Sequence, residues 1–382
     1  MNLEPARLEP LRVPRIWGVR NLQPFYPEVP SGSPLVGEAW LTGDACTFAS
    51  GPYAGQTLGH AWPEMPAEWT GTRLAHEPRI PLLAKLIFTA DKLSVQVHPD
   101  DAYAQKHERA AGGVGKTEMW YVGEAAIGSK VCVGMRANVT RETFLRAIAD
   151  GSAERCLAPI DVHAGDAIFV PAGTAHMIGP GVVLYEMQEY SDLTYRVFDF
   201  NRVGADGKPR ELHIEKAMDV LRWDSTDSSD SPSFAAGRVV PIALKTNAGA
   251  ERLLLVACRY FAVERWKFTG TITMETSPER FEVLTPLAGN GRIALPRNVA
   301  PSESRALRAA LPPNSPSPAP SAEFDYAPGQ TWLVPAALGK YEIESAQPTT
   351  LLRAYVPNLE ALERELAAAR AAQPSRASEV RP

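Results

Sequence analysis

The chain has 382 residues, 45% of them hydrophobic and 22% charged, with a formal net charge of −5. These values are typical of a soluble globular protein made of two or three structural units. The chain has 39 basic and 44 acidic residues, so it has no surplus of positive charge and we expect no nucleic-acid partner. No run of apolar residues approaches the ~18 that a membrane-spanning helix needs, so we expect no membrane span.

Short runs of β-branched and aromatic residues, bounded by Gly, Pro, Asn or Asp, recur along most of the chain and predict a mainly β protein. The expected strands, in chain order, are Lys85–Phe88, Leu93–His98, Glu118–Val122, Ala167–Val170, Val182–Met187, Thr194–Phe198, Leu253–Val256, Phe261–Lys267, Phe281–Pro286, Thr331–Pro335 and Leu351–Tyr355. Strands this numerous and this regularly spaced favour β-barrels or double-sheet jelly rolls.

Helical patterns interrupt the strands in few places. We expect helical insertions at about residues 100–115, 140–150 and 210–222. In the second of these, Thr140 is a candidate N-cap and Phe144 lies on the apolar face. A last amphipathic helix is expected to begin at residue 358 and to end before Pro374.

Two loops indicate how the chain is divided. The Ser- and Asp-rich segment Ser225–Ser233 predicts a boundary between an N-terminal domain, 1–224, and a C-terminal β domain, 234–357, followed by a helix and tail, 358–382. The proline-rich segment Pro312–Ser321 predicts an exposed insertion in the second domain. No repeat is visible in the sequence, although a repeated fold with diverged sequence is compatible with it.

The N-terminal segment and the cysteines indicate the cellular compartment in which the protein is expected to work. The N-terminal segment MNLEPARLEPLRVP has early acids and prolines and no apolar stretch, unlike a secretory signal. Cys46, Cys132, Cys156 and Cys258 are scattered with no CxxC pair, which argues against a disulfide scaffold or a cysteine zinc site. We therefore expect a cytoplasmic protein, and we expect a monomer.

Residues 85–202 hold the only chemically dense stretch. Gln96 and His98 are two apart in an expected strand, so their side chains share a face, and Lys116 and Glu118 have the same relation. A third segment, Gly165-Asp-Ala-Ile-Phe-Val-Pro-Ala-Gly-Thr-Ala-His176, reads as an apolar strand and a turn that leads into a histidine.

Gln96, His98, Glu118 and His176 together could bind a divalent metal. Each residue alone is more often structural, but two imidazoles, a carboxylate and an amide oxygen on neighbouring strands form a plausible ligand set. With no thiolate in the set, Zn(II) is favoured, one ion per chain, with Mn, Co or Fe behind it.

The spacing G-x5-P-x-G-x2-H of residues 165–176 resembles the second cupin motif, although Pro180 stands where an asparagine is usual. The glycines and the proline make a tight turn that can aim the histidine into a barrel. This resemblance predicts two cupin-type jelly-roll barrels, also called double-stranded β-helices, with a few inserted helices.

The chain as a whole resembles the type I phosphomannose isomerases (mannose-6-phosphate isomerases), which are metal-dependent cupins. The matching stretches are IWGVRNL (Ile16–Leu22), GEAW (Gly37–Trp40), GQTLG (Gly55–Gly59), PLLAKLIFTADKLSVQVHPDD (Pro81–Asp101), GKTEMWYV (Gly115–Val122), the turn before His176, EMQEYSDLTYRVFDFNR (Glu186–Arg202) and GKPRELHIEKAMDVL (Gly207–Leu221). Departures are Val19, where the family usually has a second glycine, and Ala39, where it usually has a serine.

The resemblance implies roles for individual residues. Gln96, His98, Glu118 and His176 match the family's metal ligands. Arg196 matches the family's active-site arginine, Lys116 the lysine two before the glutamate ligand, and Glu186 an acidic residue that lines the site. We expect these three to be catalytic, and we expect Lys85, Ser94, Lys116 and Arg196 to bind the substrate. From the residues alone, Arg196 could equally be a strand arginine paired with Asp192 or Asp199, and Lys116 an exposed strand lysine.

The function implied is interconversion of mannose 6-phosphate and fructose 6-phosphate by proton transfer through a cis-enediol. Such a reaction needs a base near C1 and C2 and stabilisation of charge on the sugar oxygens. For the base we favour Glu186, and a metal-bound water or Lys116 could serve the same role. Two other readings stay open, because cupins host many functions. One is a non-haem iron oxygenase, which uses two histidines and one carboxylate; the other is a non-catalytic sugar-binding cupin that retains its metal.

Overall fold

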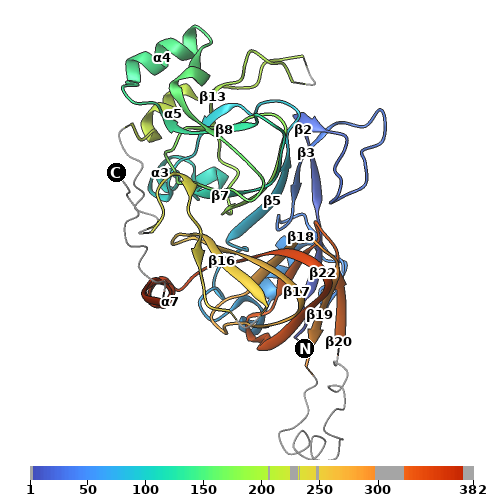
Figure 1. Ribbon diagram of the computed structural model, residues 1–382. Coiled ribbons are helices and arrows are strands. Elements are labelled where there is room, and N and C mark those ends of the chain that lie inside the picture. The colour runs from blue at the N-terminus through green and yellow to red at the C-terminus, as the bar shows by residue number, and fades with distance from the viewer. Residues whose placement is uncertain are drawn as a thin grey trace, which may run out of the picture.

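The computed structural model describes residues 3–204, 207–223, 231, 233–246, 249–296 and 322–372. It is mainly β, as predicted, and its antiparallel sheets form two β-bodies, one above the other in Figure 1. No helix in these described ranges is long and apolar enough to cross a membrane. The Pro312–Ser321 insertion, the tail beyond Ala372 and most of the predicted Ser225–Ser233 boundary lie outside these ranges.

The upper body consists of two facing sheets. The seven-stranded sheet contains β2 (Leu11–Val19), β3 (Val36–Trp40), β5 (Leu82–Phe88), β7 (Glu118–Ala125), β10 (Ala167–Val170), β12 (Val182–Glu189) and β14 (Gly237–Val239). The five-stranded sheet contains β6 (Val95–Val97), β8 (Lys130–Met135), β9 (Leu157–Asp161), β11 (His176–Ile178) and β13 (Tyr195–Phe198).

The seven-stranded sheet is covered on both faces. Ile168 of β10 belongs to the cluster between the two upper sheets, and its neighbour Phe169 to the large core shared with the lower body. This explains why all seven residues of β5, LLAKLIF, are buried: a strand covered on both faces reads as a continuous apolar run rather than an alternating one.

The lower body is built on one ten-stranded sheet that curls around its own core. Its strands are β1 (Ala6–Glu9), β4 (Thr47–Phe48), β15 (Ile242–Ala243), β16 (Ala250–Ala257), β17 (Ala262–Glu275), β18 (Glu282–Ala288), β19 (Gly291–Leu295), β20 (Ala322–Tyr326), β21 (Thr331–Val334) and β22 (Lys340–Tyr355).

The helices lie around these sheets (Figure 1). They are α1 (Leu58–Ala61), η1 (Trp62–Glu64), α2 (Ala67–Thr70), α3 (Asp101–His107), η2 (Arg109–Ala111), α4 (Arg141–Ala149), η3 (Ala153–Cys156), α5 (Ile214–Val220), η4 (Ala336–Leu338) and α7 (Leu359–Ala372). The three predicted insertions are present as α3 with η2, as α4 and as α5. The remaining short helices, α1, η1, α2, η3 and η4, were not predicted. Thr140 caps α4, and Phe144 packs with Met218 of α5 on the outer face of the five-stranded sheet.

The chain passes between the two bodies several times, whereas the single boundary predicted at residues 225–233 implies one passage. β1 pairs with β21 and β4 in the lower sheet, although it belongs to the predicted N-terminal domain. In return, β14 pairs with β10 in the upper sheet. The division into 1–224, 234–357 and 358–382 stays a proposal, and these exchanged strands show that neither body is closed by one continuous segment.

The two bodies repeat the same pairing order. Strands β10-β7-β12-β5-β3 of the upper body follow each other as β21-β18-β22-β17-β16 do in the lower one. The strand before each turn also reads alike, since residues 165–172 are GDAIFVPA and residues 329–336 are GQTWLVPA. The lower body is therefore a second barrel of the same plan, a repeat that is too diverged to be recognised from the sequence alone.

Candidate active site and metal centre

The predicted metal ligands converge from three strands. β6 and β11 pair so that His176 lies opposite Gln96, and β7 of the facing sheet contributes Glu118. The turn before β11 is tied to the same place, because the Gly173 N–H donates to the His98 carbonyl at 2.8 Å. Gly173 has a φ of +82°, in the region that glycine adopts most readily.

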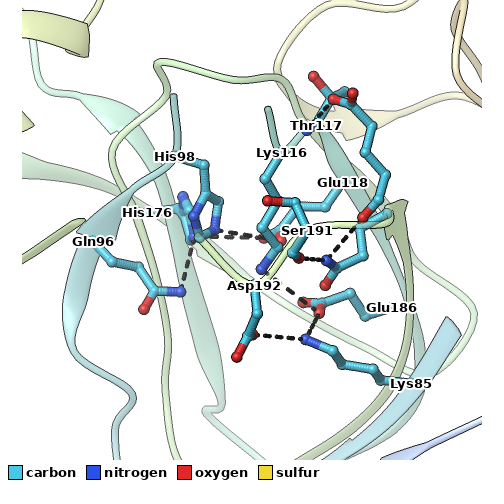
Figure 2. Close-up of polar contacts among 12 residues, drawn as sticks. Lys85, Gln96, His98, Lys116, Thr117, Glu118, His176, Glu186, Ser191 and Asp192 are labelled. Carbon is cyan, nitrogen blue, oxygen red and sulfur yellow. Dashed lines mark hydrogen bonds and ion pairs between the residues drawn. The ribbon is translucent and has the colours of Figure 1, made fainter. Parts of the chain in front are cut away.

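His98, Glu118 and His176 offer ligand atoms that all lie within 4.8 Å of one another, and all three side chains are buried. His98 Nε2 is 3.5 Å from Glu118 Oε2, and His176 Nε2 is 3.4 Å from Glu118 Oε1. Figure 2 shows both rings pointing toward the carboxylate. In the described part of the chain this is the only group of three such residues.

Both imidazoles are held in the form that a metal requires. His98 Nδ1 contacts the Leu193 carbonyl at 2.8 Å, and His176 Nδ1 contacts the Thr174 carbonyl at 2.9 Å. A carbonyl only accepts, so Nδ1 carries the proton and Nε2 presents its lone pair to the site. Burial, helped by Lys116, lowers the pKa of His98 to about 3, and burial also lowers the pKa of His176. Both rings are therefore neutral near pH 7.

These residues fit a divalent ion. His98 Nε2 and Glu118 Oε1 are buried and have no hydrogen-bond partner among the described residues, a costly arrangement that a cation at this point would relieve. Burial alone would raise the pKa of Glu118, but Lys116 and the two histidines hold it well below its usual range. Glu118 is thus an anion at the pH at which the histidines are neutral.

Gln96, the fourth predicted metal ligand, lies on the side of the site that faces the cavity. Its amide nitrogen lies 3.1 Å from His176 Nε2. A half-turn of the amide about its last bond would place the oxygen there instead, and the two orientations have nearly the same shape. Ser94 Oγ lies 3.2 Å from Gln96 Oε1 and 3.3 Å from Arg196 Nε, so it links the amide to the arginine.

Beside the metal ligands lies a second buried cluster, centred on Glu186. Its Oε1 is 3.3 Å from Lys85 Nζ and 3.9 Å from Lys116 Nζ, and its Oε2 accepts from Trp120 Nε1 at 3.1 Å. Figure 2 shows the carboxylate lying between the two lysines. Lys116 connects this cluster to the metal ligands, because its Nζ is 2.8 Å from Glu118 Oε2.

The charges in this cluster are well defined. Burial, together with the nearby Glu118, raises the pKa of Glu186 in spite of both lysines. Lys116 is only 4% exposed, so it is not the exposed strand lysine that the sequence also allowed. Burial opposes its charge, but Glu118 and Glu186 raise its pKa, so that it remains an ammonium ion.

A cavity of about 440 Å³ opens onto these groups. Of the predicted site residues, Lys85, Ser94, Gln96, Lys116, Glu186 and Arg196 line it. Arg196 donates Nε–H to Ser94 Oγ and Nη1–H to the Glu211 carbonyl at 3.1 Å, and within the described ranges it is not ion-paired with Asp192 or Asp199. All predicted site residues are therefore brought together; their individual roles stay predictions.

Other cavity residues were not predicted to belong to the site. These are Arg15, Trp17, Glu38, Asp192, Arg210 and His213, among others. Trp40 also contributes, because its ring lies 5.0 Å from Lys85 Nζ while its Nε1 donates to Glu38 at 2.7 Å. Glu38 and Trp40 belong to GEAW, and Arg210 and His213 to GKPRELH, so the segments were visible in the sequence but the directions of these side chains were not.

Comparison with known proteins places this site in a family. No family model matches the chain. It is 35% identical over 294 residues to the probable mannose-6-phosphate isomerase GmuF of Bacillus subtilis, covering 76% of this chain and 87% of that protein. A mannose-6-phosphate isomerase of Streptococcus mutans is 35% identical over 298 residues, again with 76% and 87% covered. The chain belongs to the mannose-6-phosphate isomerase family.

Solved structures agree with membership of the mannose-6-phosphate isomerase family. The mannose 6-phosphate isomerase of Bacillus subtilis superposes with a TM-score of 0.74 at 27% identity, covering 92% of this chain and 99% of the other. A putative mannosephosphate isomerase of Archaeoglobus fulgidus, at 18% identity and a TM-score of 0.66, covers 93% of this chain and 98% of its own and shares the fold. The isomerase family and the two-barrel fold predicted from the sequence are confirmed.

Proposed function

We propose that this protein interconverts mannose 6-phosphate and fructose 6-phosphate. The observation that carries the proposal is the buried Glu186, held between Lys85 and Lys116 beside the His98–Glu118–His176 set, in one cavity of a chain from this family. Neither the oxygenase nor the non-catalytic cupin is favoured by any of the comparisons.

The reaction moves a proton between C2 and C1 of the open-chain sugar through a cis-enediol. Glu186 is the proton carrier in this proposal, because a carboxylate whose pKa is raised by burial is better matched to neutral pH than an exposed one. Its hydrogen bond from Trp120 fixes one oxygen and leaves the other directed at the lysines and the cavity.

Lys116 and Lys85 supply positive charge where the enediol oxygens become anionic. Both ammonium groups already lie against Glu186, so no rearrangement is needed to bring them to the reacting carbons. Ser94 and Arg196, which are joined by a hydrogen bond beside Gln96, bind the rest of the substrate.

The metal of this proposal is Zn(II), with Mn, Co or Fe as alternatives, held by Gln96, His98, Glu118 and His176. A two-histidine, one-carboxylate, one-amide set has the nitrogen and oxygen donors that such ions accept. When bound, the ion would act as a Lewis acid that polarises a sugar oxygen. That the protein is a monomer and works in the cytoplasm stays a prediction of the sequence.

The proposal is tested by following fructose 6-phosphate formation from mannose 6-phosphate in a coupled assay. Protein stripped by a chelator is compared with protein reloaded with Zn(II), Mn(II), Co(II) or Fe(II). We expect turnover to vanish on stripping and to return on reloading. Stoichiometric metal binding without turnover by any ion would overturn the proposal in favour of a binding cupin.

A further inference from the structure

The cations of the active-site cavity differ in how they are neutralised. Lys85 and Lys116 lie against Glu186, and Arg15 forms two hydrogen bonds to Glu38, at 2.8 and 2.9 Å. The two remaining cavity cations are Arg196 and Arg210. Arg196 lies opposite Gln96 in the five-stranded sheet and is linked to it through Ser94.

Arg196 carries the uncompensated positive charge in this part of the cavity, and Arg210 keeps a free donor beside it. No carboxylate among the described residues lies within 4.0 Å of Arg196, whose hydrogen bonds go to the Ser94 hydroxyl and the Glu211 carbonyl. Arg210 binds Asp199 through Nε, at 2.7 Å, and through Nη2, which leaves Nη1 for another acceptor. Asp199 is shared with Arg202, which has Asp91 as a second partner at 3.1 Å, so two carboxylates serve these two guanidinium groups and Arg210 is ion-paired.

The segment that carries Arg210 is fixed against Arg196. The His213 N–H donates to the Arg196 carbonyl at 2.7 Å, and the Arg196 N–H donates to His213 Nδ1 at 3.4 Å. Because Nδ1 accepts, the ring proton resides on Nε2. Glu211 Oε2 lies 3.9 Å from Nε2, which is beyond hydrogen-bond distance. Among the described residues Nε2 therefore has no acceptor, and His213 offers this donor to the cavity that it lines.

We propose that Arg196, Arg210 and His213 form the subsite for the phosphate monoester of the substrate. This inference rests on the proposed function, and it assigns binding to two residues, Arg210 and His213, that the sequence did not suggest. Two guanidinium groups and a neutral N–H donor suit the three acceptor oxygens of a phosphate dianion.

The lysine end of the cavity is a poor alternative place for the phosphate. A dianion near Lys85 and Lys116 would also meet the carboxylates of Glu186, Glu118 and Asp192, which lie 2.8–3.6 Å from the two ammonium groups. Repulsion of like charges would offset the attraction there. Binding the phosphate at Arg210 instead leaves C1 and C2 free to reach Glu186.

The test compares two arginines that share Asp199. Arg210 lines the cavity, whereas Arg202 does not and instead pairs with Asp91 at 3.1 Å and with Asp199 at 2.7 Å. We expect Arg210→Met to raise KM for mannose 6-phosphate about tenfold or more, with a smaller fall in kcat, as loss of a charge-assisted hydrogen bond predicts. Arg202→Met should leave KM within about twofold of the wild-type value. Equal rises in both variants would overturn the proposal, because Arg210 would then act only through Asp199.

A second measurement does not depend on turnover. Inorganic phosphate is titrated calorimetrically into wild-type protein and both variants, with circular dichroism to confirm that each is folded. We expect Arg210→Met alone to weaken phosphate binding, and Arg210→Lys, which keeps the charge, to weaken it less. If the wild type binds phosphate in this pattern but does not isomerise mannose 6-phosphate, the subsite stands and the proposed function fails. Unchanged phosphate binding by Arg210→Met would contradict the proposed phosphate subsite.

Discussion

Trp120 shows how one side chain can serve both the core and the site. It is fully buried between the two upper sheets, and its Nε1–H also donates to Glu186 Oε2 at 3.1 Å. A buried indole N–H needs a partner, and a buried carboxylate needs a donor. The pair satisfies both needs, and it fixes the carboxylate in one orientation toward the lysines.

Glu186→Gln keeps an oxygen for Trp120 and removes the base. We expect kcat to fall at least about 100-fold, the usual lower range for general acid–base catalysis, with the metal content unchanged. Turnover and metal content are measured on the same preparation. The control is Glu124→Gln, an exposed glutamate of β7, which should behave as wild type. Near-full turnover of metal-loaded Glu186→Gln would remove Glu186 as the proton carrier.

At the scale of elements, the sequence predicted the bounds of the strands better than it predicted which strands pair with each other. Ala167–Val170 was predicted with the bounds that β10 has, and β12 was only two residues longer than predicted. The alternation of residue types is a local property, so it is readable from one strand at a time. The pairing that places Lys85 opposite Glu186 joins residues far apart in the chain, and nothing in either strand specifies it.

The candidate site could likewise be predicted only where the local sequence pattern indicates the direction of a side chain. Gln96, Glu118 and His176 could be grouped with His98 because these three lie in strands and His98 directly follows β6, so the sequence indicates the direction of each side chain. Arg210 lies in a segment without regular structure, and His213 just before α5. Side-chain direction there depends on tertiary contacts such as that with Arg196, which periodicity does not report.

The turn before β11 should be sensitive to the loss of its glycine. Gly173 has a φ of +82°, and a Cβ there would lie 2.8 Å from the Val220 carbonyl oxygen. Gly128 has the same φ and nothing within 4 Å of a Cβ. We expect Gly173→Ala to lower the melting temperature more than Gly128→Ala, which bears only the conformational cost of roughly 1 kcal/mol.

Gly173→Ala should also weaken metal binding, measured by competition with a chromogenic chelator, because this turn aims His176. Gly128→Ala should bind metal like the wild type. Equal effects of the two substitutions would show that backbone conformation alone matters at residue 173.

At the scale of the whole molecule, the second barrel carries a rearranged version of the first site. The strand registers pair Glu118 with Val170 and Glu282 with Val334, and they pair Glu186 with Lys85 and Arg353 with Glu264. The equivalent positions are Glu118 and Glu282, Glu186 and Arg353, and Lys85 and Glu264. Tyr341 takes the place of His176, since its hydroxyl donates to Glu282 Oε2 at 3.2 Å and its strand partner is Met274 where His176 has Gln96.

The second barrel thus neutralises its buried glutamates with arginines. Burial alone would raise the pKa of Glu264, but Arg353 and Arg252 lower it to about 2. Because this value is below the ordinary 4.5, the ionised carboxylate stabilises the fold above pH 4.5, and the contribution, about 3 kcal/mol, is lost as the pH falls toward 2.

We therefore expect Glu264→Gln to lower the free energy of unfolding at pH 7 by several kcal/mol and to flatten the loss of stability between pH 4.5 and 2. Denaturant unfolding at a series of pH values measures both effects. Glu275→Gln, at an exposed position of the same strand, is the control. A wild-type pH dependence in Glu264→Gln would assign the acid sensitivity to other carboxylates.

Removing the metal should affect the two barrels unequally. Stripping leaves His98 Nε2 and Glu118 Oε1 buried without hydrogen-bond partners, so amide hydrogen exchange should speed up in β6, β7 and β11. Strands β17 and β18, whose buried Glu264 and Glu282 have arginine partners, and β22, which carries Arg353, should exchange as before. Similar acceleration in both would mean that the barrels unfold as one unit.

The repeat gives each molecule an internal standard. One barrel plan is present twice in the same chain, once with a glutamate arranged for a metal and once with the equivalent glutamate bound by an arginine. Differences in amide hydrogen exchange between equivalent strands then show how much an exchangeable metal ion contributes to rigidity, compared with an arginine side chain that is part of the chain. Both are measured at the same temperature, in the same solvent and at the same concentration.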